Sequence, residues 1–267
     1  MFIELVRSQG WAVSHILPEA DVWTSLAQQT LRAVADDLRL CAQQADLLFQ
    51  ELSATVIVVV FSPLGLLVAH IGDGRAGGQR PDGKWQALLE PFRGEEANAT
   101  VFITSAIWEA DKMAKYIGTN VFSHPFRAFT LLSDGCERAT FELLKLNETT
   151  QHHDTYNQPY ARFFDPNVAA MIRLYESGKT KIDVNDSWAA LLKDGIPAFA
   201  QETDDKTLIL AVNSTFLHLD DTIADESDEA TAATQEVSVG LASQIQGKHK
   251  RPQSKKKNRD FKRKSRQ

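Results

Sequence analysis

Cysteine is scarce in this chain of 267 residues, which has only Cys41 and Cys136, far apart and outside any Cys-x-x-Cys pair. That scarcity excludes a disulfide framework and a cysteine-based zinc site. Long apolar runs are also lacking, because no stretch reaches the roughly 18 uninterrupted apolar residues of a membrane-spanning helix. The first ten residues carry Glu4 and Arg7 within their apolar pattern, unlike a signal peptide. We therefore expect a cytoplasmic protein with no membrane partner.

Charge of one sign is distributed unevenly along the chain. Residues 248–267 hold 11 Lys and Arg and a single acid, so the formal net charge of −6 divides into +10 in this run and −16 elsewhere. Residues 220–236 hold seven acids and almost no large apolar side chain. We expect one folded domain over 1–217 and a disordered tail over 218–267, acidic and then basic. The basic run could bind a polyanion such as nucleic acid, or it could fold back on the acidic body.

The spacing of apolar residues predicts a mixture of helices and hairpins. Intervals of three and four predict a long helix over 21–48. Two strand-sized apolar runs, 56–61 and 66–71, flank a Ser-Pro-Leu-Gly turn and predict a hairpin buried on both faces. The remaining expected elements are a helical segment over 2–10, a hairpin around 81–84, strands over 101–104, 129–133 and 207–212, and helices over 137–144, 167–177 and 186–193. Hairpins in place of strict β-α-β alternation indicate an α+β layered sandwich.

Acidic residues lie where several of these strands begin or end. Asp73 follows one strand within Gly-Asp-Gly, Asp134 follows another within Ser-Asp-Gly, and Asp204 and Asp205 precede the last strand. Carboxylates at strand ends can converge at one rim of a sandwich, and hard cations such as Mg²⁺ and Mn²⁺ prefer oxygen ligands. A pair of such ions can activate water for displacement at phosphorus. Each Asp taken alone, however, is more simply explained as an ordinary turn residue.

Taken in order, the motifs resemble those of the metal-dependent, type 2C (PPM-type) serine/threonine protein phosphatases. Gly-Asp-Gly, "LLSDG" over 131–135 and "DDKTLILAV" over 204–212 resemble three elements of that family. Two further stretches, "GEEANATVFITS" over 94–105 and "PYARFF" over 159–164, are similar to a bacterial branch. The resemblance covers about residues 1–213. It implies a four-layer α-β-β-α sandwich of mainly antiparallel sheets, hydrolysis of phosphoserine and phosphothreonine on phosphoprotein substrates, and a two-metal site for Mn²⁺ or Mg²⁺.

The resemblance also implies roles for individual residues. Asp134 and Asp204 match the carboxylates that hold the first metal, and Asp73 matches a carboxylate linked to an additional, weaker metal. Asp205 stands where the family often has Asn. Arg138 departs from the acid that many eukaryotic members carry at its position, which puts a third metal in doubt.

Other polar residues carry weaker signals. A set within the bacterial-type stretch could form a loop near the substrate, although turn support explains it more simply: Gly94, Glu95, Asn98 and Thr100. His70 lies inside an apolar strand and is expected to be packed, whereas His152 and His153 are expected in a solvated loop. Neither cysteine has a base nearby in sequence, so a cysteine nucleophile is not expected.

The family opens with several strands and an Asp-Gly-x-Gly motif whose Asp bridges both metals, preceded by an Arg that contacts the phosphate. This sequence contains no counterpart, and Asp82-Gly83 falls too late to substitute. We therefore expect a phosphatase domain over 1–217 whose N-terminal part is absent, a sandwich missing its first strands, and impaired hydrolysis with no catalytic residue assigned. The alternative is a non-catalytic, degenerate phosphatase fold that acts as a binding module.

Overall fold

The computed structural model describes residues 16–92 and 100–216, and all of these except Phe216 belong to a unit spanning Met1–Thr215. The predicted helical segment over 2–10, the predicted tail over 218–267, and Gly94, Glu95 and Asn98 lie outside the described residues. No helix in the described ranges is both long and apolar enough to cross a membrane.

The first two layers are helix α2 (Ala20–Gln44) and an antiparallel sheet in the order β1-β2-β5. The strands are β1 (Val56–Ser62), β2 (Gly65–Ile71) and β5 (Gly118–Phe122). One face of α2 buries Trp23 and Leu31 against this sheet, and the Trp23 Nε1–H donates to the Val68 carbonyl over 2.7 Å. Burial of an apolar stripe at helical spacing is what stabilises such a helix.

The predicted long helix is confirmed, but it ends earlier than expected. After Gln44 the chain turns at Asp46, whose φ of 55° lies in the left-handed region. The hairpin β1–β2 is also confirmed, with Ser62 paired to Gly65 across the turn. Strand β2 is buried throughout, whereas β1 is only half-buried, because β1 is the outer strand of its sheet in the described ranges.

The third layer is a second antiparallel sheet in the order β4-β3-β6-β9. Its strands are β3 (Arg75–Gln79), β4 (Trp85–Ala87), β6 (Ala128–Leu132) and β9 (Leu208–Val212), so the predicted hairpin around 81–84 is confirmed. A core cluster joins the two sheets: Leu66 and Val68 of β2 pack with Ala76 of β3 and with Phe126. The sheets therefore face each other across an apolar layer.

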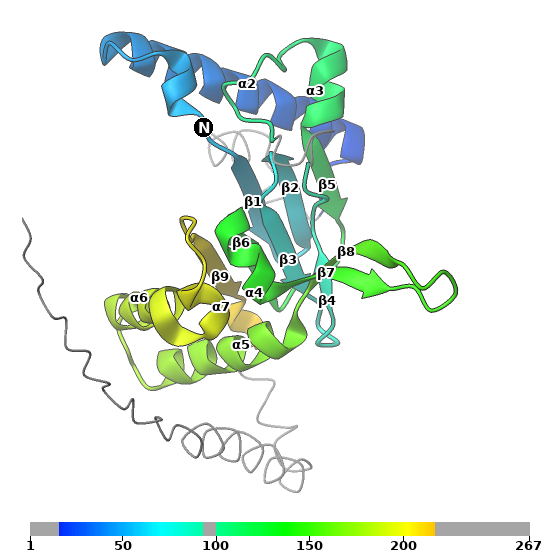
Figure 1. Cartoon of the computed structure of the whole chain (residues 1–267), viewed down its shortest axis with the longest axis vertical. Helices are drawn as coiled ribbons and strands as arrows, with labels where there is room; N and C mark the ends of the chain where they lie inside the picture. The colour runs from blue at the N-terminus through cyan, green and yellow to red at the C-terminus, as the bar shows by residue number, and fades with distance from the viewer. Residues whose placement is uncertain (1–15, 93–99, 217–267) are drawn as a thin grey trace, which may run out of the picture. The chain divides into compact units, whose positions relative to one another are not determined.

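Helices α5 (Ala161–Glu176), α6 (Lys181–Ala190) and α7 (Pro197–Ala200) form the fourth layer, as Figure 1 shows. Phe164 of α5 packs on Trp85 with ring centroids 4.7 Å apart, and Trp188 of α6 donates from Nε1 to the Leu208 carbonyl over 2.9 Å. The chain is thus an α+β protein with an α-β-β-α layer order and antiparallel sheets, as predicted.

Several elements differ from the sequence-based expectation. The helix predicted over 137–144 stops after one turn as α4 (Glu137–Thr140), and the chain continues as β7 (Phe141–Leu146), which pairs with β8 (His153–Pro159). This pairing with the next strand overrides the local helical spacing, as tertiary context often does for strands. The strand predicted over 101–104 is absent; a turn forms there, in which Ser105 N–H donates to the Phe102 carbonyl. A short helix not foreseen, α3 (Ala110–Tyr116), precedes β5.

Candidate metal-binding rim

Asp73 lies in the tight connection between β2 and β3. The preceding Gly72 has φ +104°, and a Cβ there would lie 2.4 Å from Thr55 Cγ2, so only glycine fits. The Gly72 carbonyl accepts a hydrogen bond from the Phe92 N–H at 2.9 Å. This backbone geometry places a half-buried carboxylate at the end of β2.

Asp134 begins the short 3₁₀ turn Asp134–Cys136 that follows β6. Its Oδ1 accepts the Gly135 N–H at 2.9 Å, and the residue lies at the surface, where it is partly exposed. Gly135 is tightly approached, because a Cβ there would lie 2.4 Å from the Asp205 carbonyl oxygen. The backbone that carries Asp204 and Asp205 therefore runs directly against the loop that carries Asp134.

Ser133 holds these two loops together. Its Oγ donates to the Asp205 carbonyl at 3.1 Å and accepts from the Thr207 N–H at 3.0 Å. The Ser133 N–H donates to the Thr207 carbonyl at 3.0 Å, which extends the β6–β9 pairing by one step. Asp204 and Asp134 are thus carried by neighbouring strand ends of one sheet.

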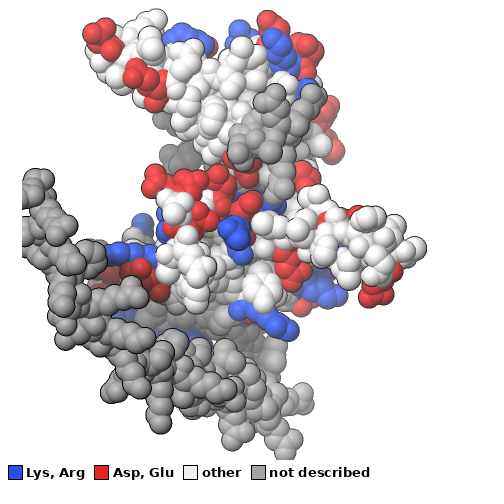
Figure 2. Space-filling model, viewed as in Figure 1, with Lys and Arg blue, Asp and Glu red and all other residues white. Residues whose placement is uncertain are grey.

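The Asp134 carboxylate is repelled by the carboxylates around it. The pKa of Asp134 is raised above its ordinary value, first by partial burial and then by repulsion from Asp73, with smaller contributions from Asp204 and Glu137. The Gly135 N–H opposes this shift. Figure 2 shows acidic side chains gathered near the middle of the face it draws, in the part of the view where Figure 1 places β6 and α4.

Sequence reasoning singled out Asp73, Asp134 and Asp204, and Asp134 lies within electrostatic range of both Asp73 and Asp204. It missed Glu137. The available signal was spacing, since a residue three positions after Asp134 lies on the same side of a helical turn.

The carboxylates of the rim are of the chemical type that binds a divalent cation, but among the described residues they are too few to hold one. The residues are oxygen donors whose mutual repulsion a cation would offset, which suits Mg²⁺ or Mn²⁺. Within residues 16–92 and 100–216, however, no three His, Cys, Asp or Glu side chains are arranged to hold one metal ion. The described carboxylates are therefore suited to a divalent cation by their chemistry, but no three of them are arranged around one.

The other residues weighed in the sequence contribute no further catalytic group. His70 is buried as expected, with its Nε2 2.8 Å from the Glu90 carbonyl oxygen, and burial lowers its pKa. Cys136 is a buried free thiol, and burial raises its pKa to about 11, so a reactive thiolate is scarce. His152 and His153 are exposed, and His153 begins β8.

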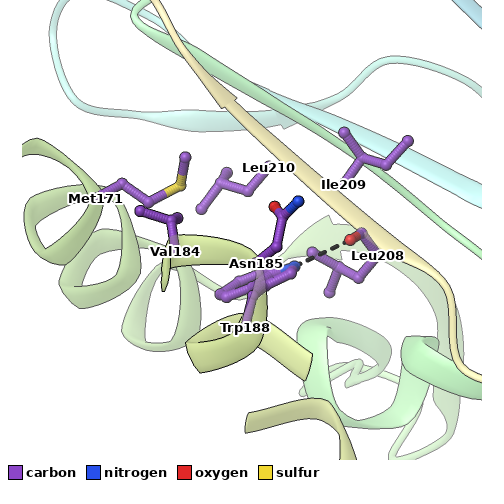
Figure 3. Close-up of a pocket in the computed structure, with 7 residues that line it drawn as sticks. All are labelled: Met171, Val184, Asn185, Trp188, Leu208, Ile209 and Leu210. Atoms are coloured by element: carbon purple, nitrogen blue, oxygen red, sulfur yellow. Dashed lines mark hydrogen bonds between the residues drawn. The ribbon is translucent and has the colours of Figure 1, made fainter. Parts of the chain in front are cut away.

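A small cavity of about 150 Å³ lies between α5, α6 and β9 (Figure 3). Its lining is mostly apolar and contains no ionisable side chain: Met171, Val184, Asn185, Trp188, Leu208, Ile209 and Leu210. The only hydrogen bond drawn among these residues joins the Trp188 indole to the Leu208 carbonyl. This cavity offers packing and no acid–base chemistry.

Comparison with known proteins agrees with the motifs. The chain is 29% identical over 174 residues to serine/threonine-protein phosphatase 3 of Escherichia coli (strain K12), a match that covers 64% of this chain and 60% of that protein. It is also similar to the crystal structures of Staphylococcus aureus serine/threonine phosphatase Stp1 (16% identity, 75% and 71% of the two chains, TM-score 0.38) and of a bacterial serine phosphatase (15% identity, 74% and 73%, TM-score 0.37). The family profile described as protein phosphatase 2C matches residues 4–177, more than half of the chain. The chain therefore belongs to the protein phosphatase 2C family.

Proposed function

We propose that this chain carries the catalytic carboxylates of a metal-dependent phosphatase that hydrolyses phosphoserine and phosphothreonine in phosphoproteins. The observation that supports the proposal most directly is that Ser133 bonds the loop of Asp134 to the segment that follows Asp204, through the Asp205 carbonyl and the Thr207 N–H. Family membership supports the reaction class, while the chain spans about 60% of the length of the curated relative it matches.

In this proposal Asp134 and Asp204 hold one Mn²⁺ or Mg²⁺ ion, and Asp73 helps to hold a further one. Bound ions of this kind supply a water of lowered pKa and neutralise charge on a phosphoryl group. The chain's own contribution is placement: Ser133 and Gly135 allow the loops of Asp134 and Asp204 to lie against each other. Repulsion among the carboxylates is then relieved only when cations are present.

We further infer that hydrolysis by this chain alone is slow. The described residues contain no group of three ligands arranged for one ion, and metal-assisted hydrolysis requires ions in fixed geometry. Weak binding of Mn²⁺ combined with slow turnover is therefore the expected behaviour.

Titration calorimetry with Mn²⁺ tests the proposal at its central residue. Asp134→Asn keeps the side chain's size and removes its charge, so we expect Mn²⁺ binding to be lost or strongly weakened. Asp82→Asn is the matched control, because Asp82 is an exposed turn carboxylate paired with Arg80 and lies outside the rim. Identical isotherms for wild type and Asp134→Asn would refute the metal assignment. The same proteins assayed on p-nitrophenyl phosphate and on a phosphoserine peptide report hydrolysis.

One observation favours a second candidate, a non-catalytic phosphatase fold that binds phosphoproteins. It is the incompleteness of the metal site among the described residues. Under this reading a phosphoserine peptide binds without Mn²⁺ and is not turned over at any Mn²⁺ concentration. Turnover that requires Mn²⁺ would favour the phosphatase.

For the basic run over 248–267, we infer at most weak, salt-dependent binding of a polyanion. The run carries a net +10 and the remainder −16, and its only aromatic residue, Phe261, gives it little capacity to stack on bases.

A further inference from the structure

A buried arginine connects the loops that carry two of the rim carboxylates. Arg75 is only 1% exposed, and its Nε donates to Glu137 Oε2 at 2.8 Å. Arg75 follows Asp73 by two residues, and Glu137 follows Asp134 by three. The ion pair is therefore a short cross-link between the β2–β3 connection and the turn after β6.

Residues of the β7–β8 hairpin also contact the Arg75 guanidinium. Arg75 Nη1 donates to Asn157 Oδ1 from β8, and the guanidinium carbon lies 5.4 Å from the centre of the Phe141 ring at the start of β7. Asn157 in turn donates to the Leu89 carbonyl at 2.8 Å and to Glu90 Oε2 at 3.2 Å. One side chain thus contacts residues from α4, β7 and β8.

Stability alone is a weak explanation for this arrangement. Burying a charged pair removes both groups from water, and well-packed apolar residues often replace such a pair without loss of stability. The Arg75 Nη2 is also buried and makes no hydrogen bond within the described ranges. The planar fork of the guanidinium, however, fixes the direction of the bonds that Arg75 makes.

We propose that Arg75 is a positioning residue: by clamping Glu137 and Asn157 it sets the separation of Asp73 and Asp134, and so the affinity of the rim for a divalent cation. This inference rests on the function proposed above. In the absence of the clamp, the Asp134 turn is still paired to β3 through Leu132 and to β9 through Ser133. The rim then persists, but its two carboxylate loops are no longer fixed to each other by a side chain.

The test uses substitutions that conserve charge and break geometry. Arg75→Lys keeps the positive charge and removes the fork, and Glu137→Asp keeps the negative charge and shortens the side chain by one methylene. We expect each to lower Mn²⁺ affinity by about tenfold or more, the range seen when groups that orient metal ligands are changed. Calorimetric Mn²⁺ affinity is the readout, with the thermal unfolding midpoint recorded for each variant.

Two controls separate positioning from general effects. Arg80→Lys alters an exposed arginine just beyond the other end of β3 and should leave Mn²⁺ affinity unchanged. Ile117→Val removes a methylene from the core cluster under α2 and should lower stability without lowering affinity. If Arg75→Lys does not fold, Glu137→Asp carries the test.

Unchanged affinity in both charge-conserving variants would overturn the inference. Higher affinity would also overturn it, because the guanidinium would then be competing with the cation for Glu137. An equal loss in Ile117→Val would show that lower stability is the cause. The Asp134→Asn arm keeps the two proposals distinct: if Asp134→Asn also leaves binding unchanged, the metal assignment itself fails.

Discussion

At the scale of single residues, glycine decides whether the rim can form. Gly135 admits the Asp205 carbonyl where any side chain would collide, and Gly72 supplies a positive φ beside Asp73. The sequence indicated both positions through the motifs Gly-Asp-Gly and Ser-Asp-Gly. It did not indicate why glycine is needed, since the approach of Asp205 depends on how β9 pairs with β6.

Gly135→Ala should therefore damage the rim through the backbone. The added Cβ would lie 2.4 Å from the Asp205 oxygen, so the loop of Asp204 must move away. We expect the free energy of unfolding to fall by about 1–3 kcal/mol, as for other overpacked sites, and Mn²⁺ affinity to fall with it. Chemical denaturation and calorimetry measure the two effects.

Gly178→Ala is the control for the glycine-to-alanine change itself. A Cβ at Gly178 meets no atom within 4 Å, although its φ of +72° carries a backbone strain. We expect a loss of stability and unchanged Mn²⁺ affinity. Equal affinity in Gly135→Ala and wild type would show that the Asp204 loop does not depend on this contact.

The contacts of Arg75 with Glu137 and Asn157 could not be predicted from the sequence, for a related reason. Asp73, Asp134 and Asp204 were predicted because each sits in a local motif of three or four residues. Arg75 meets Asn157 across 82 positions, by way of a hairpin that local spacing interpreted as a helix. Strand pairing determines a contact of that kind, and strand pairing cannot be predicted from neighbouring residues alone.

At the scale of elements, periodicity was a good guide where an element buries one face and a poor guide elsewhere. Helix α2 and the β1–β2 hairpin were predicted because their apolar residues face a core. Strand β7 was not, because its apolar residues lie on both faces: Phe141 is buried, whereas Leu144 and Leu146 are exposed. Helix α6 was found only in part, and it too buries no residue fully.

Helix α6 is tied to the sheet chiefly through Trp188, which makes a testable prediction. Trp188→Phe removes the indole donor to the Leu208 carbonyl and keeps an aromatic ring against the cavity of Figure 3. We expect the free energy of unfolding to fall by about 1–2 kcal/mol, the cost of a lost hydrogen bond plus imperfect packing. Urea denaturation measures the difference.

Trp108→Phe provides a matched comparison. The Trp108 Nε1 is buried and has no hydrogen-bond partner within the described ranges, so replacing the indole by a phenyl ring breaks no hydrogen bond there. Its cost should be clearly smaller than that of Trp188→Phe. Equal costs for the two substitutions would show that the Trp188 hydrogen bond adds nothing to stability.

At the scale of the whole molecule, the layer order followed from composition and pattern. Apolar strands joined by hairpins and separated by helices indicated a layered α+β sandwich, and the family motifs indicated four layers, which the structure has. The order of strands within each sheet did not follow. The sheet order β4-β3-β6-β9 brings together strands more than 70 positions apart in sequence, and only packing of the complete core selects that arrangement.

Charge distribution over the whole chain leads to a prediction about nucleic acid. Because the basic run has a single aromatic residue and the whole chain carries a net charge of −6, we expect the intact chain to be barely retained by immobilised single-stranded DNA at low salt, and deletion of 248–267 to change little. Strong retention that disappears both on deletion and at high salt would instead establish a polyanion site. Retention that salt does not affect would contradict both weak binding and a polyanion site, since each depends on charge interactions that salt screens.

The half-buried strand β1 bears on how readily this protein aggregates in solution. Its residues Val56–Ser62 contain no charge and no proline, and within the described ranges the strand pairs on one side only, with β2. An uncharged β-branched segment with an open edge is a template on which further chains can add in cross-β fashion. We therefore expect aggregation of the chain through this edge to increase with protein concentration, so that a dilute preparation stays in solution longer than a concentrated one.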